Sequence, residues 1–269
     1  MKTRFNLKKC LFLALALLAG FCTKVAAQEA DNADKPDFAS VSPSGQVLYY
    51  KIVDYGEVAV WPYEDNPYLL GGHIIVPRVV RHDDINYVVT GVADNAFTNC
   101  IRIQGIEFPT TMFYIGNEAF KGCTDLRVVQ MPKTLTAIGT SAFEGCSSLI
   151  DVVMPDAVVE MGGYVFKDCS SVRHFVLSHS LTEIPEGTFL NCAMVTDYFI
   201  PANVTKFGCD AFAGNDKLKT VTFFGAIPPL PVCNSELSFP NTIPIYVTRQ
   251  AFDAYKASYI WGQYAIKTM

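Results

Sequence analysis

The chain has 269 residues, of which 50% are hydrophobic and 17% are charged. This composition supports a sizeable buried core and excludes disorder over most of the length. The formal net charge is −5, and no basic cluster offsets it. Nucleic acid is therefore not expected as a partner, because an acidic surface repels phosphate backbones.

Residues 1–27 have the features of a signal peptide. Four basic residues lie within residues 2–9, an uncharged apolar stretch follows at 10–21, and Val25-Ala26-Ala27 offers the small side chains that a signal peptidase needs. The apolar stretch is too short to span a bilayer, which takes about 20 residues. A buried N-terminal helix is the alternative. We expect cleavage before Gln28 and export to the cell surface, the medium or the periplasm, without a membrane span.

The next segments predict a flexible leader and a β-rich cap. Residues 28–44 are polar with scattered Pro and Gly, which is typical of a flexible leader. Residues 45–91 carry short runs of alternating or β-branched residues, and we expect these runs to form an N-terminal β cap. The expected strands are 47–52, 58–60, 74–77 and 87–89, the last one after a turn at Asp83-Asp84.

A 23-residue period dominates residues 92–225. It is carried by six phenylalanines without a single slip: Phe97, Phe120, Phe143, Phe166, Phe189 and Phe212. Three residues after each stands one member of a second row: Cys100, Cys123, Cys146, Cys169, Cys192 and finally Asn215. Six in-phase units of this length predict an array of stacked coils, because one such coil cannot bury its apolar residues alone.

The third of these units predicts the path of one coil. Val129 and Met131 alternate as a short strand requires, and Pro132 ends that strand because it cannot donate to a ladder. Gly139 is expected to permit a tight bend, and Phe143 to fill the far side of the coil. Neighbouring coils should then pair their strands about 4.8 Å apart.

The pattern L-x-x-V-x-h-P, then I-G-x-x-A-F, then G-C resembles the repeat of the bacterial BspA-type leucine-rich-repeat surface proteins. The resemblance covers roughly residues 92–224, with departures at Val165, Ser178 and Thr188. It implies a leucine-rich-repeat solenoid, a right-handed coil of short parallel strands that is mostly β and irregular. A β-rich cap would precede it, and a strand-helix cap would follow it.

Residues 226–269 are expected to form that C-terminal cap. Ile227-Pro228-Pro229 stops the repeat, residues 245–247 read as a last strand, and residues 251–259 predict a short helix. Both ends of a solenoid need such caps, because an open end exposes core residues and unpaired strand edges.

The strand positions that point away from the core are the candidate binding residues. One row contains Gly105, Val128, Asp151, His174, Asp197 and Thr220. The parallel row contains Glu107, Gln130, Val153, Val176, Phe199 and Thr222. The resemblance implies that this face lines a concave surface where partners dock. We take the middle of both rows as the candidate site: Val128, Gln130, Asp151, Val153, His174, Val176, Asp197 and Phe199. An ordinary solvated sheet face is the alternative.

Two other sets of side chains are candidates for a metal or redox site. The row Asp151, His174 and Asp197, with Asp156 and His179 nearby, could hold a cation, but a flat row of side chains does not converge on a point. The ladder cysteines lack any C-x-x-C spacing, so we expect buried, packing thiols. No metal, cofactor or catalytic motif is predicted.

These observations favour an exported recognition or adhesion module that is not an enzyme. Its expected partner is a protein, either a host extracellular protein or a bacterial surface protein, or else a glycan. The rival hypothesis is an envelope scaffold that assembles with other proteins through its caps.

Overall fold

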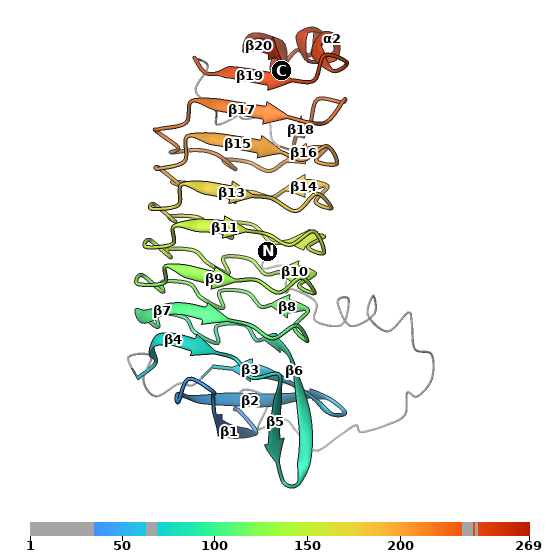
Figure 1. The fold of residues 1–269 in the computed structure, drawn as a ribbon. Coiled ribbons are helices and arrows are strands. Elements are labelled where there is room, and N and C mark those ends of the chain that lie inside the picture. Colours follow the sequence, from blue (N-terminus) through green and yellow to red (C-terminus); the bar gives the residue numbers. More distant parts are fainter. Residues whose placement is uncertain (1–34, 63–68, 233–238, 240–241) are drawn as a thin grey trace.

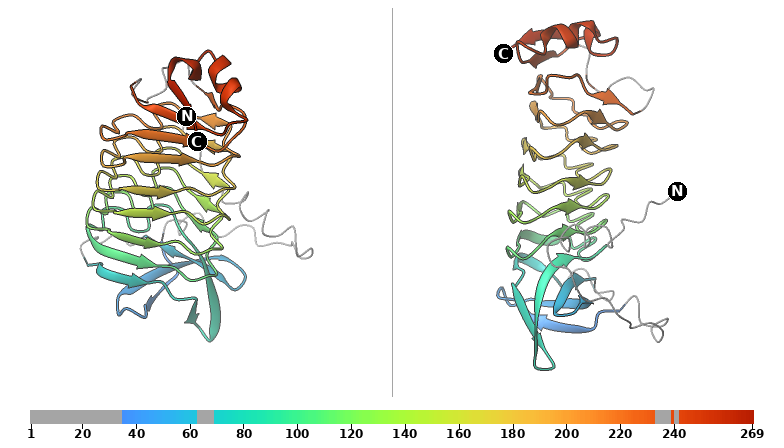
Figure 2. Two further views of the ribbon diagram at one scale, coloured as in Figure 1. Left: turned by 45° about the horizontal axis from the view of Figure 1, so that its top comes forward. Right: turned by 90° about the vertical axis from the view of Figure 1, so that its right-hand side faces the viewer.

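The computed structural model describes residues 35–62, 69–232, 239 and 242–269. The predicted signal peptide and the leader up to residue 34 lie outside the described residues. The described chain forms a solenoid whose coils stack from the N-terminal to the C-terminal cap (Figures 1 and 2). This architecture confirms the predicted fold class.

Each coil of the array carries one longer and one two-residue strand, on different sides of the stack. The longer strands are β7 (Arg102–Glu107), β9 (Val128–Gln130), β11 (Asp151–Val153), β13 (His174–Val176), β15 (Asp197–Ile200) and β17 (Thr220–Phe223). The short strands are β8 (Tyr114–Ile115), β10 (Ala137–Ile138), β12 (Glu160–Met161), β14 (Glu183–Ile184), β16 (Lys206–Phe207) and β18 (Leu230–Pro231).

The strands pair in parallel and mostly at the 23-residue register that the sequence predicts. Asp151 lies opposite His174 and Asp197 opposite Thr220 among the longer strands, and Ala137 lies opposite Glu160 among the short ones. A third row of backbone hydrogen bonds joins the coils on the phenylalanine side. The Phe97 N–H donates to the Ala119 carbonyl at 2.8 Å, and the same bond recurs at Phe120, Phe143, Phe166 and Phe189.

The six phenylalanines lie in file inside the stack, as predicted. Consecutive ring centroids are 5.0 to 6.2 Å apart, and all six side chains are buried. The ring planes of Phe97 to Phe189 are within 14° of parallel from one coil to the next. Offset stacking of aromatic rings adds to the free energy of apolar burial, so this file ties each coil to its neighbours.

The five ladder cysteines are buried and free, which confirms the predicted packing thiols. The structure adds that four of them donate their S–H to the phenylalanine carbonyl of the preceding coil, at 3.0 to 3.2 Å. At the end of the row the Asn215 amide donates to the Phe189 carbonyl at 2.9 Å. The hydrogen bond to the preceding phenylalanine carbonyl is therefore kept at position 215, although Asn stands there in place of Cys.

The glycines that recur at one repeat position, Gly116, Gly139, Gly162 and Gly208, have a different role from the predicted one. Gly139 was expected to permit a tight bend, but its φ is not among the positive values of the chain. A Cβ at Gly139 would lie 2.5 Å from the Asn117 nitrogen of the preceding coil. Gly116, Gly162 and Gly208 meet the preceding coil in the same way. Glycine is required there because two backbones approach closely.

Two other positions in every coil adopt left-handed backbone. The first is occupied by Asn95, Glu118, Ser141, Tyr164, Gly187 and Asp210. The second is occupied by Asn99, Gly122, Gly145, Asp168, Asn191 and Gly214. The second position holds only the residue types that tolerate this conformation best, and the coil turns there.

The N-terminal cap begins earlier than the sequence predicts. β1 (Phe38–Val41) lies inside the expected flexible leader and pairs antiparallel with β2 (Val47–Asp54), because the buried Phe38 ring stacks on Tyr50 and His82. β3 (Glu57–Trp61) continues this sheet. β5 (Val79–His82) and β6 (Ile85–Val92) form the hairpin expected at Asp83-Asp84, and both turn residues have positive φ, as such tight turns require.

The cap also covers the first open edge of the longer strands. β4 (Gly71–Ile75), which overlaps the strand expected at 74–77, pairs in parallel with β7. On the other side of β4, the Ile75 N–H donates to the Ser44 hydroxyl at 2.9 Å, and the Gln46 amide donates to the Gly71 carbonyl at 3.1 Å. These two side chains satisfy backbone groups that an open edge would leave unpaired.

The C-terminal cap contains one strand more than predicted. β19 (Pro244–Val247) is not the last strand, because β20 (Ala265–Thr268) pairs with it after the helix α2 (Phe252–Ala257) and the 3₁₀ turn η1 (Trp261–Gln263). The fully buried Trp261 contacts aromatic rings of the last coils and donates its indole N–H to the Pro229 carbonyl at 2.7 Å. This ring closes the apolar core at the C-terminal end.

The two glycine roles predict different costs for the same substitution. Gly145→Ala should destabilise the protein by about 1 kcal/mol, because φ is +75° there but the nearest atom to a new Cβ is 3.6 Å away. Gly139→Ala should cost at least about 2 kcal/mol, because its Cβ would overlap backbone. Urea unfolding of both variants measures the difference. Equal destabilisation would contradict the assigned role of Gly139.

Position 215 holds Asn where the preceding coils hold Cys, and we expect Asn215 to be energetically coupled to Tyr198. The buried Tyr198 hydroxyl donates to the Asn215 side chain at 2.9 Å, whereas the preceding coil has Phe175 and Cys192 at these two positions. Asn215→Cys should cost about 1–3 kcal/mol, because the Tyr198 hydroxyl loses its partner. Adding Tyr198→Phe should recover most of this loss in a double-mutant cycle of unfolding free energies. Strictly additive costs would refute the coupling.

Candidate binding face

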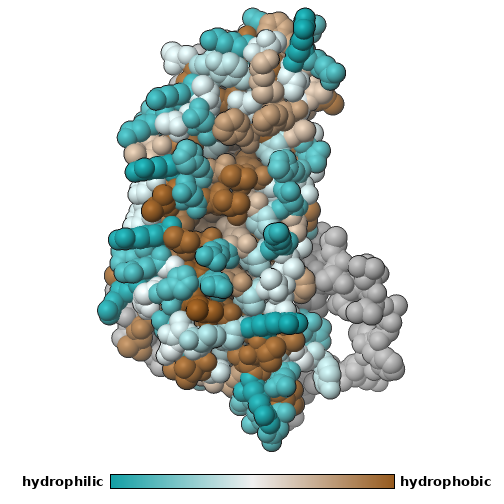
Figure 3. All heavy atoms as spheres, in the orientation of Figure 1, coloured by the Kyte–Doolittle hydropathy of each residue, from teal (hydrophilic) through white to brown (hydrophobic). Residues whose placement is uncertain are grey.

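The solvent-facing side of β9, β11, β13 and β15, called here the long-strand face, carries the predicted site residues. Seven of the eight are exposed and Asp197 is half-buried. Val153 is 61% exposed and Phe199 is 54% exposed, although both side chains are apolar. In Figure 3 brown, apolar side chains gather along the middle of this face, with teal, polar side chains on both sides.

Two residues of the predicted rows are buried and do not belong to the face. Gly105 lies opposite His73 of β4, whose ring nitrogen would be 2.5 Å from a Cβ at this position. Thr222 is only 7% exposed because its neighbours in the ladder are Phe199 and Tyr246, which project on either side of it. The exposed part of the face is therefore bounded by the N-terminal cap and by these aromatic residues.

Two apolar residues extend the face beyond the predicted rows. Ile150, just before β11, and Phe224, just after β17, are both exposed. The Phe224 ring stacks on Phe199 with a centroid distance of 6.5 Å. Strand alternation could not indicate them, because both lie outside the strands. The repeat carries a signal for Phe224, which stands 23 residues after Pro201, at the repeat position that Pro132 occupies in an earlier coil.

The polar residues of the face differ in how firmly they are held. Both oxygens of the Asp197 carboxylate accept hydrogen bonds, one from Thr196 at 2.7 Å and one from Thr220. Asp151 and His174 lie opposite each other on β11 and β13 and are exposed. Asp197 is thus fixed by its own coils, while Asp151 and His174 face solvent.

The side chains that the sequence offers as a cation site do not form one among the described residues. Asp156 accepts hydrogen bonds from the His179 backbone at 3.0 Å and from its ring at 2.8 Å, and these bonds lower the pKa of the Asp156 carboxyl. Among the described residues, no group of three or more His, Cys, Asp and Glu side chains is arranged to hold a metal ion. In the same part of the chain, no helix has the length and apolar character needed to cross a bilayer.

Known proteins resemble the chain in the repeat region and in the fold. A model of the BspA-type leucine-rich-repeat region matches residues 90–219 with six copies. No curated protein matches the chain significantly in sequence.

Two solved bacterial structures share the fold. The leucine-rich-repeat protein TpLRR of T. pallidum is 26% identical, with a TM-score of 0.58 over 72% of this chain and 82% of that one. A leucine-rich cell surface protein of Faecalibacterium prausnitzii A2-165 is 23% identical, with a TM-score of 0.55 over 82% of this chain and 69% of that one. Residues 90–219 therefore match the BspA-type leucine-rich-repeat region, and the chain shares the leucine-rich-repeat fold.

Proposed function

We propose that this protein is an exported recognition module that binds a protein partner through the long-strand face. The observation that carries the proposal is the set of exposed apolar side chains on adjacent coils, Val153, Val176 and Phe199, within a largely polar surface. Covering them would remove apolar area from water, which drives most protein association. The proposal gives the chain no catalytic role.

The architecture of the face suits binding. Its side chains stand on short strands of a stacked array, in which β11 pairs with β13 and β15 with β17 at the 23-residue register, so little order has to be gained on association. The polar residues Gln130, Asp151 and His174 lie beside the apolar ones and supply directional contacts. An apolar centre with a polar surround is the usual anatomy of a protein interface. Adhesion is one use of such a face.

Export is supported by the signal-peptide features of residues 1–27 and by one covalent feature. Cys209 is disulfide-bonded, whereas the five ladder cysteines are free. Disulfides persist in oxidising compartments, which for a bacterium are the periplasm, the cell surface and the medium.

A scaffold that assembles through its caps is the second candidate. The aromatic residue Trp261 cannot make such contacts itself, because it is fully buried. Tyr259, which is 90% exposed, is one of several exposed apolar residues of the described C-terminal cap that could; the others include Ile227, Leu230, Val232 and Met269.

Substitutions on the face should separate the two candidates. Val176→Asp with Phe199→Asp is expected to weaken capture of protein partners at least about tenfold, because two anchors become charged. Immobilised protein is exposed to panels of host extracellular and bacterial surface proteins. Val159→Asp is the matched control, since Val159 is exposed to a similar extent on the short-strand side. Loss of capture in Tyr259→Asp alone would favour the scaffold instead.

The cysteines predict a definite labelling pattern. Burial raises the pKa of the ladder thiols, for Cys100 to about 12, so alkylation of the folded protein near pH 8 should leave the five ladder cysteines unmodified. In unfolded, unreduced protein from the cell envelope, those five should react while Cys209 stays protected until a reductant is added. Mass spectrometry reads out each site. Labelling of Cys209 before reduction would argue against an oxidising destination.

A further inference from the structure

A row of cationic side chains runs along one edge of the long-strand face. Arg127, Arg173 and Lys219 each stand directly before a longer strand, at β9, β13 and β17. All three are exposed, and within the described part of the chain no ion pair or side-chain hydrogen bond engages them. The exposed Ile150 takes the same repeat position before β11. We call Arg127, Arg173 and Lys219 the cationic row.

The adjoining row of the face leaves the cationic row largely unmatched. Between Arg127 and Lys219 it contains two carboxylates, Asp151 and Asp197. The Asp197 carboxylate already accepts hydrogen bonds from two threonines, whereas Asp151 is exposed and lies opposite a histidine. This edge therefore offers more unengaged cations than anions, although the whole chain has a net charge of −5.

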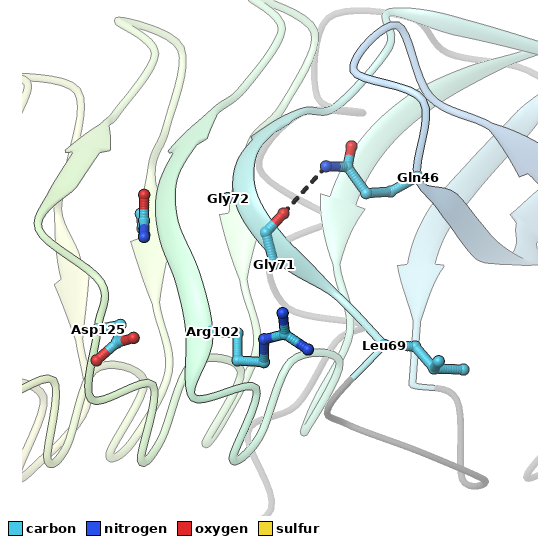
Figure 4. Close-up of a pocket in the computed structure, with 7 residues that line it drawn as sticks. Gln46, Leu69, Gly71, Gly72, Arg102 and Asp125 are labelled. Carbon is cyan, nitrogen blue, oxygen red and sulfur yellow. Dashed lines mark hydrogen bonds between the residues drawn. The ribbon is translucent and has the colours of Figure 1, made fainter.

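The cationic row ends before the N-terminal cap. Gln104, which is neutral, takes the same repeat position in the first coil. Figure 4 shows Arg102 of this coil and Asp125 of the next coil beside the cap, where both signs of charge are present. The unengaged cations begin at Arg127, so they border the coils that carry the exposed apolar side chains of the face.

The spacing along the stack favours a helix as the bound element. Val153, Val176 and Phe199 stand on consecutive coils, which lie about 4.8 Å apart, and the cations stand on alternate coils, about 9.6 Å apart. An α-helix laid along the stack advances about 5.4 Å per turn, and residues seven apart share a face at about 10.5 Å. Side chains on one face of an extended chain recur about 6.7 Å apart, which matches neither spacing.

We infer that the partner segment bound by the long-strand face is an amphipathic helix with an acidic edge. Its apolar stripe covers Val153, Val176 and Phe199, and its carboxylates pair with the cationic row, since guanidinium groups bind carboxylates with two hydrogen bonds. A sulfated polysaccharide has the charge but lacks an apolar stripe. The inference rests on the proposed protein-binding function and adds the charge and secondary structure of the partner.

The test compares three peptides of about 18 residues, each held helical by lactam bridges. All three share a leucine stripe, and the edge positions that lie seven residues apart carry glutamate, lysine or glutamine. Fluorescence anisotropy measures their binding to the exported form. The glutamate peptide should bind at least about tenfold more tightly than the lysine peptide, because ion pairs replace repulsions at three exposed cations. Higher ionic strength should reduce this ratio.

Charge reversal on the edge should invert the preference. Arg127→Glu with Arg173→Glu should make the lysine peptide bind more tightly than the glutamate peptide, and Arg127→Gln with Arg173→Gln should reduce the original ratio. The matched control is Arg78→Glu with Arg249→Glu, which changes the net charge equally but lies in the two caps and should leave the ratio intact. All four arginines are exposed, so thermal unfolding should be unchanged.

Equal binding of the glutamate and lysine peptides would overturn the inference, and so would a ratio that the reversal at Arg127 and Arg173 does not change. Silence of all three peptides has the same meaning. Binding of heparin through these arginines without binding of the glutamate peptide would assign the row to a sulfated polysaccharide instead. If all three peptides bind equally and Val176→Asp with Phe199→Asp abolishes their binding, the acidic helix is refuted while the protein-binding face stands.

Discussion

The whole molecule depends on one constraint: neighbouring coils have to match one another at three places along their path, where backbone hydrogen bonds join most of them. The longer strands, the short strands and the phenylalanine turn each form such a row. All three rows stay in phase only if successive coils have equal length in residues. Buried backbone groups that lose their partners are costly, so the constraint fixes which residue stands beside which over the full array.

This constraint explains why the fold could be predicted so far from the sequence. A constant period implies equal coils, and equal coils place Phe120 beside Phe143 and Cys123 beside Cys146 without any further information. The caps lack the period and were predicted less well. The strand at Phe38 could not be predicted from the sequence, because burial of the Phe38 ring depends on contacts with Tyr50 and His82 that form only in the folded chain. β20 was missed for the same reason, since its pairing follows a helix and a turn.

On the candidate binding face, the repeat period predicts which side chains point outward but not how exposed each one is. Register predicted that Val153, Val176 and Phe199 point outward, and all three are exposed. It also placed Thr222 there, but exposure depends on the size of neighbours, and two aromatic side chains cover it.

The equal length of the coils has a consequence for how such chains change over time. Gain or loss of one complete 23-residue unit leaves the remaining coils matched to their neighbours. A single extra residue is accommodated before β18, where the strands pair at 24 residues, but larger departures would shift the rows against one another. The array can therefore grow or shrink in whole units of about 4.8 Å. The length of the solenoid, and with it the surface area available to a partner, therefore changes by one repeat unit at a time.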